Sequence, residues 1–345
     1  MQAYYDQDAD LSILRNKTLG VIGYGNQGRA QALNWRDSGL TVVVGVLRDA
    51  SAVRAEADGF PVVSIAEAAA TADILSLLVP DEVQRRVYDE VLASRLGPGK
   101  TLNFAHGYNI HFGLIVPPPG VDVVMVAPRM IGTMVREAYT QGSGAPAFVA
   151  VAQDASGHAL ETALALARGI GATRVGVLPT TFAQETELDL FQEQGLWPLL
   201  VRTMTMAFEF LVAQGFPPEM VALEMYGSGE AAEIFREMAR VGFFKQMRFH
   251  SQTSQYGTLS RAQNVPFTAE IESFMHRAMA EIRSGNFAAE WRREQETGYE
   301  LFSRLRAEAD RHALNQAEAA VRQIIKFGPQ EVGETEAGAP AKEPT

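Results

Sequence analysis

The sequence predicts an α/β protein whose N-terminal part is built on a mostly parallel sheet and whose C-terminal part is all helical. From Thr18 to about Leu178, short β-branched runs alternate with helix-like segments, and several runs are apolar at consecutive positions. This pattern is typical of parallel strands that helices cover on both faces. After Pro179 the β-branched runs largely disappear, and apolar residues recur at helical spacing. The change of periodicity indicates a second, helical domain.

The predicted elements follow from these patterns in order along the chain. The strands are the runs TLGVIGYG, TVVVGVL, FPVVS, DILSLLVP, TLNFAHG, VDVVMVAP, AFVAVAQ and TRVGVLP. Helices are predicted between them, such as NQGRAQALNWRDSG, and after them, such as LLVRTMTMAFEFLVAQG and AEIESFMHRAMAEIRSG. The tail has no large apolar residue beyond one valine, so it is expected to be disordered. We predict domains at residues 1–180 and 181–327, and a disordered tail at residues 328–345.

Composition narrows the classes of function. The 345-residue chain carries 30 Lys and Arg against 41 Asp and Glu, a net charge of -11, and no cysteine. The negative charge argues against nucleic acid or an anionic membrane as a partner and favours a small-molecule substrate. The lack of cysteine excludes disulfides, zinc–thiolate sites and a cysteine nucleophile. The N-terminus does not read as a secretory signal, and no apolar run approaches the length of a membrane span, so we expect a soluble cytoplasmic protein.

A glycine motif, GYGNQG, stands between the first predicted strand and the helix after it. In this context Gly23 permits a tight turn, Gly25 lets a pyrophosphate approach the backbone, and Gly28 lets helix and strand pack closely. The motif favours a Rossmann-type domain that binds a nicotinamide dinucleotide, and a tight turn without a ligand is the alternative. The expected cofactor contacts in this motif are Gly23, Tyr24, Gly25, Asn26, Gln27 and Gly28.

The end of the second strand bears on which nicotinamide cofactor is used. NAD-binding proteins usually place an acid here, about 20 residues after the glycines, but the stretch VVVGVLRDASAVR fills the strand end with valine and leucine. Arg48 and Ser51 suit a 2′-phosphate, so NADPH is favoured. Asp49 would repel that phosphate and could instead bind a ribose hydroxyl, which keeps NADH as the alternative. Arg48 can also be read as a solvated loop charge.

Asp189 and Glu193 in QETELDLFQEQG are four residues apart and are predicted to share one helix face. Two carboxylates so placed repel each other unless a cation or proton lies between them. A hard divalent ion such as Mg²⁺ is therefore a candidate to bind between them. Acid pairs at this interval are also common on exposed helices. The spacing alone therefore leaves both interpretations open.

Several motifs together resemble one family, the ketol-acid reductoisomerases, from Tyr4 to about Phe327. They are GVIGYGNQGRAQALNWRDSG, LLVPDEVQ, FAHGYNIHFG, VDVVMVAP, FAQETELDLFQEQ, PPEMVALE, QYG and SGNFAAEW. The resemblance implies NADPH and two Mg²⁺ ions, with which that family shifts an alkyl group in an acetohydroxy acid and then reduces the resulting ketone, in branched-chain amino-acid biosynthesis. It also implies a knotted helical domain and a homodimer in which the partner chain completes each active site.

The resemblance also assigns roles to individual residues. His106 in FAHG matches the active-site histidine and, with Pro80, is placed at the cofactor. A satisfied buried histidine is the other reading of His106. Asp189 and Glu193 match the ligands of the magnesium pair. Glu224 matches a carboxylate at the second metal, supplied across the dimer, and Ser251 matches a serine that binds the substrate carboxylate.

The first departure from the family pattern lies in ALEMYGSGE. Where the family has a second carboxylate one turn after the Glu224 position, this chain has Ser228, flanked by two glycines. Glu230 is six residues from Glu224, so on a continuous helix it is expected to point to a different face. Binding of the second metal ion should therefore be weakened. We assign Glu224, Ser228 and Ser251 to substrate binding.

The second departure lies in VAPRMIGTMVR, where the family has a lysine followed by glycine and proline. This chain has Arg129, Met130 and Ile131. Arginine is always protonated and presents a flat fork, so it does not reproduce a lysine that must fit among metal-bound oxygens or exchange protons. The third departure is the stretch MRFHSQTSQYG. It aligns with the family pattern only when a gap is introduced, and it has glutamine where the family has acids.

These departures concentrate where alkyl migration would occur, whereas the cofactor motif is intact. We predict a diverged NAD(P)H-dependent reductase of a small 2-oxo acid, hydroxy-keto acid or imine, with the isomerisation lost or altered. A genuine Mg²⁺-dependent ketol-acid reductoisomerase is one alternative, and a non-catalytic cofactor-binding homologue is another. The predicted catalytic residues are His106, Arg129, Asp189 and Glu193, with one Mg²⁺ held by Asp189 and Glu193.

Overall fold

The computed structural model describes residues 2–265 and 269–325, which form two compact units. Unit 1 comprises the described residues up to Gly195 together with Met275–Glu296. Unit 2 comprises the described residues of Leu196–Phe274 and those from Thr297 on. The boundary expected at residue 180 thus falls within unit 1, since Phe182 and the helix it begins pack on the sheet domain. The tail predicted to be disordered lies outside the described residues.

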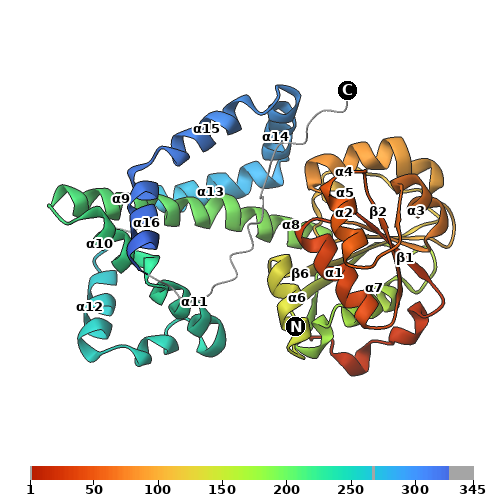
Figure 1. Ribbon diagram of the computed structural model, residues 1–345, viewed down its shortest axis with the longest axis horizontal. Helices are drawn as coiled ribbons and strands as arrows, with labels where there is room; N and C mark the ends of the chain where they lie inside the picture. Colours follow the sequence, from red (N-terminus) through yellow and green to blue (C-terminus); the bar gives the residue numbers. More distant parts are fainter. Residues whose placement is uncertain (1, 266–268, 326–345) are drawn as a thin grey trace. The chain divides into compact units, whose positions relative to one another are not determined.

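Unit 1 is built on one eight-stranded sheet in the order β3-β2-β1-β4-β5-β6-β7-β8 (Figure 1). All neighbouring strands run parallel except β6 and β7, which are antiparallel. The prediction of a mostly parallel sheet is confirmed, and each of the eight predicted runs contains one strand. The strands are β1 (Thr18–Ile22), β2 (Thr41–Gly45), β3 (Val62–Val63), β4 (Ile74–Leu77), β5 (Thr101–Phe104), β6 (Asp122–Pro128), β7 (Ala147–Gln153) and β8 (Val177–Pro179).

Helices cover both faces of this sheet. On one face, α1 (Asn26–Asp37) and α7 (Ala159–Gly169) contribute Trp35 and other side chains to one buried cluster. On the other, α3 (Ile65–Thr71) and the segment after α4 contribute to a second cluster. The continuous apolar runs of the strands follow from this double cover, because both faces lose their water. The remaining helices of unit 1 are α2 (Ala50–Ala57), α4 (Asp81–Val87), α5 (Tyr108–His111), α6 (Gly132–Thr140), α8 (Phe182–Phe191) and α14 (Asn286–Glu296).

One edge of the sheet collects the segments that matter for function. The strands β1, β4, β5 and β6 are parallel neighbours, so their carboxyl ends lie at the same edge. The glycine motif follows β1, Pro80 follows β4, His106 follows β5 and Arg129 follows β6. In open sheets of this type, ligands bind in the crevice outside the carboxyl ends of the strands.

Unit 2 is helical in its described part, as the second half of the sequence predicts. Its core is small and contains Phe208, Val221, Ala222, Ala317 and Val321. Large apolar side chains remain on its surface, including Phe244 and Tyr256, which are 70% and 71% exposed. Its helices are α9 (Trp197–Ala213), α10 (Pro218–Ala222), α11 (Glu230–Val241), α12 (Gln252–Ala262), α15 (Glu300–Asp310) and α16 (Ala313–Ile324), and α13 (Ala269–Arg283) begins in unit 2 and ends in unit 1.

One expectation about the membrane is wrong as stated. The helical stretch Phe182–Ala213 is long and apolar enough to cross a membrane by length and composition, although the sequence was expected to contain no such run. Its two ends pack in different units, because Phe182 packs on the sheet of unit 1 and Phe208 packs in the helical core of unit 2. Only 6% of its most apolar window is buried within the chain, however, so packing inside the chain covers little of it.

Candidate active site

The glycine loop is shaped as a dinucleotide-binding turn. Gly23 has a φ of +97°, a left-handed conformation that favours glycine. A Cβ atom on Gly28 would lie 2.2 Å from the backbone oxygen of Gly23, so only glycine lets α1 approach the strand end this closely. At Gly25 a Cβ atom would meet nothing within 4 Å, which leaves open space at the helix N-terminus. The free backbone N–H groups of the first turn fit a pyrophosphate there.

The side chains of Asn26 and Gln27 connect the glycine loop to the loop that carries Arg129. Gln27 Nε2 donates to the backbone oxygen of Met130 at 2.8 Å, and the backbone N–H of Thr133 donates to Asn26 Oδ1 at 3.0 Å. Both residues were predicted to contact the cofactor. Their side chains hold the neighbouring loop, and the contact with the cofactor stays a prediction that falls to their backbone N–H groups.

Three further residues predicted to contact the cofactor have distinct surroundings. Tyr24 is buried, and its hydroxyl donates to Asp58 at 2.8 Å, which places it beneath the loop. Arg48 is 81% exposed and pairs with Glu56 at 3.3 Å. The Ser51 backbone N–H donates to Asp49, whose carboxylate therefore caps α2. Pro80, also a predicted contact, is exposed just before α4.

The centre of the candidate site is an ion-paired cluster around Glu185, which is fully buried. One Glu185 oxygen lies 2.9 Å from His106 Nδ1 and also accepts from the Gly107 backbone N–H at 2.8 Å. The other accepts from Arg129 at 2.8 Å. Arg129 also donates to Asp189 at 2.5 Å, so its flat fork bridges two carboxylates one turn apart on α8. The predicted catalytic residues His106, Arg129 and Asp189 are thus brought together.

The charges of the cluster set the protonation states. Burial alone would lower the pKa of His106, but the hydrogen bond and charge of Glu185, followed by Asp81 and Asp189, raise it to about 9. His106 is therefore an imidazolium at neutral pH. Burial, with the neighbouring carboxylates, raises the pKa of Asp81 to about 6. Burial, followed by the charge of Asp189, also raises the pKa of Glu193. The effect of Asp189 on Glu193 indicates that these two predicted ligands lie near each other.

Three side chains of the cluster carry atoms that could hold a metal ion. His106, Glu185 and Asp189 offer ligand atoms within 4.8 Å of one another. Arg129 and His106 already neutralise part of this negative charge, so the carboxylate oxygens left for a metal ion are those of Asp189 that face away from Arg129 and those of Glu193. Two carboxylates with water can hold Mg²⁺. The Mg²⁺ site at Asp189 and Glu193 stays a prediction, since Glu193 does not belong to the set of described residues whose ligand atoms lie within 4.8 Å of one another.

The sequence motifs did not identify Glu185 as a site residue. It lies one turn before Asp189 on α8, and the acids at positions 185, 189 and 193 form a row at intervals of four residues. That row was the available signal, because residues at this interval share a helix face. A buried acid between an arginine and a histidine was not predictable from the spacing alone.

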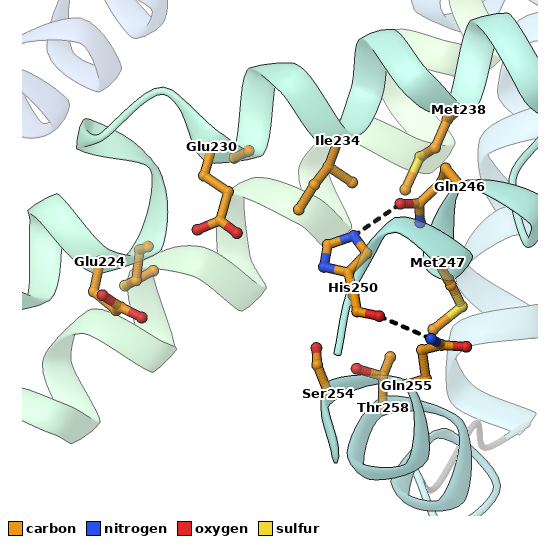
Figure 2. Close-up of a pocket in the computed structure, with 12 residues that line it drawn as sticks. Glu224, Glu230, Ile234, Met238, Gln246, Met247, His250, Ser254, Gln255 and Thr258 are labelled. Atoms are coloured by element: carbon orange, nitrogen blue, oxygen red, sulfur yellow. Dashed lines mark hydrogen bonds between the residues drawn. The ribbon is translucent and has the colours of Figure 1, made fainter. Parts of the chain in front are cut away.

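In unit 2, the GSG stretch ends one helix and starts another. The helical segment Leu223–Gly227 stops at Ser228, and Gly229 takes a left-handed conformation with φ +87° before α11 begins at Glu230. This break corrects the expectation that Glu230 points away from Glu224. Both acids line one pocket of about 350 Å³, whereas Ser228 does not (Figure 2).

Ser228 and Ser251, both predicted to bind substrate, lie at helix termini. Ser228 Oγ accepts from the Glu230 backbone N–H at 3.4 Å. Ser251 is the N-cap of α12, and its hydroxyl accepts from the Ser254 backbone N–H at 3.2 Å. The Ser251 hydroxyl thus caps the start of α12, whereas the N-cap of α11 is Gly229 and not Ser228. Ser254 rather than Ser251 lines the pocket.

Comparisons with known proteins agree with this architecture. Residues 13–176 match the acetohydroxy acid isomeroreductase NADPH-binding domain, and residues 182–327 match the ketol-acid reductoisomerase C-terminal domain. Proteins named ketol-acid reductoisomerase (NADP(+)) from Pyrobaculum arsenaticum and Pyrobaculum calidifontis are each 45% identical, covering 94% of this chain and 98% and 99% of theirs. A solved NADH-preferring ketol-acid reductoisomerase from an uncultured archean superposes with a TM-score of 0.90 at 39% identity, covering 95% of this chain and all of that one.

Proposed function

Because the chain belongs to the ketol-acid reductoisomerase family and is a nicotinamide-dependent oxidoreductase, we propose that it reduces a small 2-oxo acid, hydroxy-keto acid or imine. In this proposal the alkyl migration of the family is lost or altered. The single observation that carries it is the Arg129 bridge between Glu185 and Asp189. A permanently charged guanidinium here supplies positive charge to the carboxylates that a pair of metal ions would otherwise neutralise.

The two half-reactions of the family make different demands on the site. Migration requires two divalent ions to acidify an alcohol and to polarise the adjacent carbonyl together. In this chain Ser228 stands where the family has the second carboxylate, and its hydroxyl accepts a long hydrogen bond from the Glu230 backbone N–H, at 3.4 Å. Reduction requires a bound nicotinamide, an oriented C=O or C=N bond, and a group that stabilises or protonates the nascent atom. The Arg129 and His106 cations meet the last demand.

The residues of the cluster have distinct roles in the proposed reduction. The imidazolium of His106 donates a proton to the nascent oxygen or nitrogen, and Glu185 keeps that ring charged and oriented through Nδ1. Arg129 holds the substrate carboxylate or the developing negative charge. Asp189 and Glu193 would hold one Mg²⁺, which when bound supplies Lewis-acid polarisation of the substrate carbonyl.

We propose NADPH as the preferred reductant and a homodimer as the working assembly. Arg48 and Ser51 suit a 2′-phosphate, and Asp49, which would repel it, is occupied as a helix cap. The two Pyrobaculum relatives are named for NADP(+), and the archean structure is described as NADH-preferring, so both cofactors are worth testing. The exposed aromatic side chains of unit 2, such as Phe210 at 63%, support a second copy that covers them.

The deciding experiment measures NADPH and NADH oxidation with acetolactate and, separately, with its already rearranged 3-hydroxy-2-oxo acid, each with and without Mg²⁺. We expect turnover of the rearranged acid alone. Failure with both acids would direct the search to imines. Absence of nicotinamide cofactor binding by the purified chain would contradict the proposal altogether.

A genuine ketol-acid reductoisomerase is the second candidate. The observation in its favour is the 45% identity to proteins of that name over nearly the whole chain. Turnover of acetolactate with Mg²⁺ would establish it. In that case Glu224 and water, or another carboxylate, must complete the second metal site.

A further inference from the structure

We propose that Gln27 is a positioning residue for Arg129. Its side chain lies in the first turn of α1, directly after the glycine loop, and binds the loop between β6 and α6 that carries the guanidinium. The inference rests on the proposed reduction, in which Arg129 holds the substrate carboxylate or the developing negative charge. It gives the Gln27 side chain a role in the placement of that cation, apart from any contact with the cofactor.

The hydrogen bond from Gln27 reaches the residue next to Arg129. Gln27 Nε2 donates to the backbone oxygen of Met130 at 2.8 Å. The Arg129 backbone N–H donates to the backbone oxygen of Pro146, also at 2.8 Å. The backbone from which the guanidinium extends is therefore held on one side by α1 and on the other by the residue before β7.

The amide of Gln27 is itself held in one orientation. Gln31, one turn later on α1 and fully buried, donates from Nε2 to Gln27 Oε1 at 3.1 Å. With its oxygen engaged as an acceptor, Gln27 presents its NH₂ group to the carbonyl of Met130. The opposite orientation would set two oxygens against each other at Met130, because a carbonyl oxygen only accepts.

The two loops also touch through their backbones. A Cβ atom on Gly132 would lie 2.1 Å from the Asn26 backbone oxygen, so α6 begins in close contact with the start of α1. The Thr133 backbone N–H donates to Asn26 Oδ1 at 3.0 Å, and the Met130 side chain packs against the cluster that contains Ala30. Helices α1 and α6 pack against each other beyond these loops (Figure 1). A displacement of one loop is therefore passed to the other.

The far end of Arg129 demands an accurate placement of its backbone. The guanidinium contacts Glu185 at 2.8 Å and Asp189 at 2.5 Å, and its carbon lies 5.0 Å from the ring centroid of Phe148. Both carboxylates belong to α8, so the planar fork fits them only when the loop after β6 keeps its distance from that helix. A displacement of about 1 Å at a reacting group can cost about 100-fold in rate. The hydrogen bond from Gln27 keeps this distance.

The first arm of the test needs neither turnover nor cofactor. Gln27→Met removes the N–H donor and keeps the length of the side chain. The rate at which phenylglyoxal modifies Arg129, whose side chain is 29% exposed, is followed by peptide mass spectrometry in the full chain. We expect modification about tenfold faster than in the unaltered chain, as the loss of one hydrogen bond allows.

Two further variants accompany this measurement. Gln27→Glu keeps the shape of the side chain but sets a carboxylate against the Met130 carbonyl, so it should accelerate the modification at least as much. The matched control is Gln141→Met, since Gln141 lies at the end of α6 and donates to Glu137 of the same helix. The control should leave the rate unchanged.

The second arm separates positioning from cofactor binding. In Gln27→Met we expect kcat for NADPH oxidation to fall about tenfold, as for one lost hydrogen bond. The Kd of NADPH, measured by fluorescence titration, should change less than about twofold, because backbone N–H groups are the proposed phosphate donors. In an Arg129→Lys background the same substitution should change kcat less than about twofold, since lysine cannot form the bidentate bridge that Gln27 positions.

An unchanged modification rate of Arg129 in Gln27→Met, or an equal acceleration in Gln141→Met, would overturn the inference. A weakened affinity for NADPH with unaltered kcat would make Gln27 a cofactor contact alone, and fully additive losses with Arg129→Lys would show that the two residues act independently. Either result also overturns it. Faster modification of Arg129 in a chain that reduces none of the tested acids or imines would uphold the positioning role and reject the proposed reduction, so the two failures are distinguishable.

Discussion

The acids of the two units lie in opposite environments. In unit 1, Glu185 is fully buried, and each of its oxygens is engaged by His106, Gly107 or Arg129. In unit 2, Glu224 and Glu230 line an open pocket without such partners among the described residues. A buried charge persists only when it is paired, whereas an exposed one can wait for a ligand. Unit 1 thus carries its own counter-charges, whereas the exposed carboxylates of Glu224 and Glu230 in unit 2 are left to solvent.

Removing the charge of Glu185 should affect stability and activity more than any other change considered. Glu185→Gln leaves the Arg129 and His106 cations without their shared partner, so we expect a loss of about 3–5 kcal/mol in the free energy of unfolding. Reductase activity should fall by roughly 100-fold or more, because proton donor and guanidinium both lose their position. Urea unfolding and steady-state NADPH oxidation measure these effects. Glu187→Gln is the control, since Glu187 forms a peripheral pair with Arg283, and an equal loss there would remove the special role of Glu185.

The pH dependence tests whether the unit 1 cluster holds a proton donor. The pKa of His106 is raised to about 9, so the donating imidazolium predominates below that pH and is lost above it. We expect the rate of reduction to fall roughly tenfold per pH unit above about pH 9, provided that proton donation limits turnover. A profile of kcat/KM against pH measures the limb. If His106→Asn keeps the same limb, another group must be the donor.

Two glycines of the cofactor loop allow effects on packing to be separated from effects on cofactor binding. Gly28→Ala drives a Cβ atom into the backbone of Gly23, so we expect it to destabilise the protein by about 1–3 kcal/mol and to abolish cofactor binding. Gly25→Ala meets nothing within 4 Å. It should leave stability within about 0.5 kcal/mol and weaken NADPH binding about tenfold, because the methyl group occupies the space of the pyrophosphate. Thermal unfolding and fluorescence titration separate the two, and full NADPH affinity in Gly25→Ala would contradict the placement of the pyrophosphate.

A further prediction concerns the helix break in unit 2. Gly229→Ala forces a side chain into a left-handed conformation, which costs about 1–2 kcal/mol. The strain favours a continuous helix and so turns Glu230 away from Glu224. Urea unfolding of this variant measures the loss of stability, and Gly298→Ala, at another left-handed glycine distant in sequence from the pocket, shows what the same strain costs elsewhere. Unaltered stability of Gly229→Ala would contradict the left-handed conformation at this break.

Much of the fold could be read from local patterns. Eight runs predicted the eight strands, and the glycine motif predicted the turn between β1 and α1, because strand burial and tight turns leave local marks on the sequence. The site was predictable in part. His106, Arg129 and Asp189 were expected and lie together, but the partner that connects them, Glu185, was not. The regular spacing of acidic residues along a helix does not show which of them is buried.

The order of the elements, the glycine turn and the residue types of the site follow from local sequence patterns. The partners of the site residues follow from the packing of the elements. It paired Arg129 with two carboxylates, gave the side chains of Asn26 and Gln27 to the neighbouring loop, and turned Glu230 into the same pocket as Glu224. The physical reason is that periodicity and turn chemistry act between residues close in the chain. Ion pairs and pockets depend on distances between residues far apart in it, and those are fixed only when strands and helices have packed.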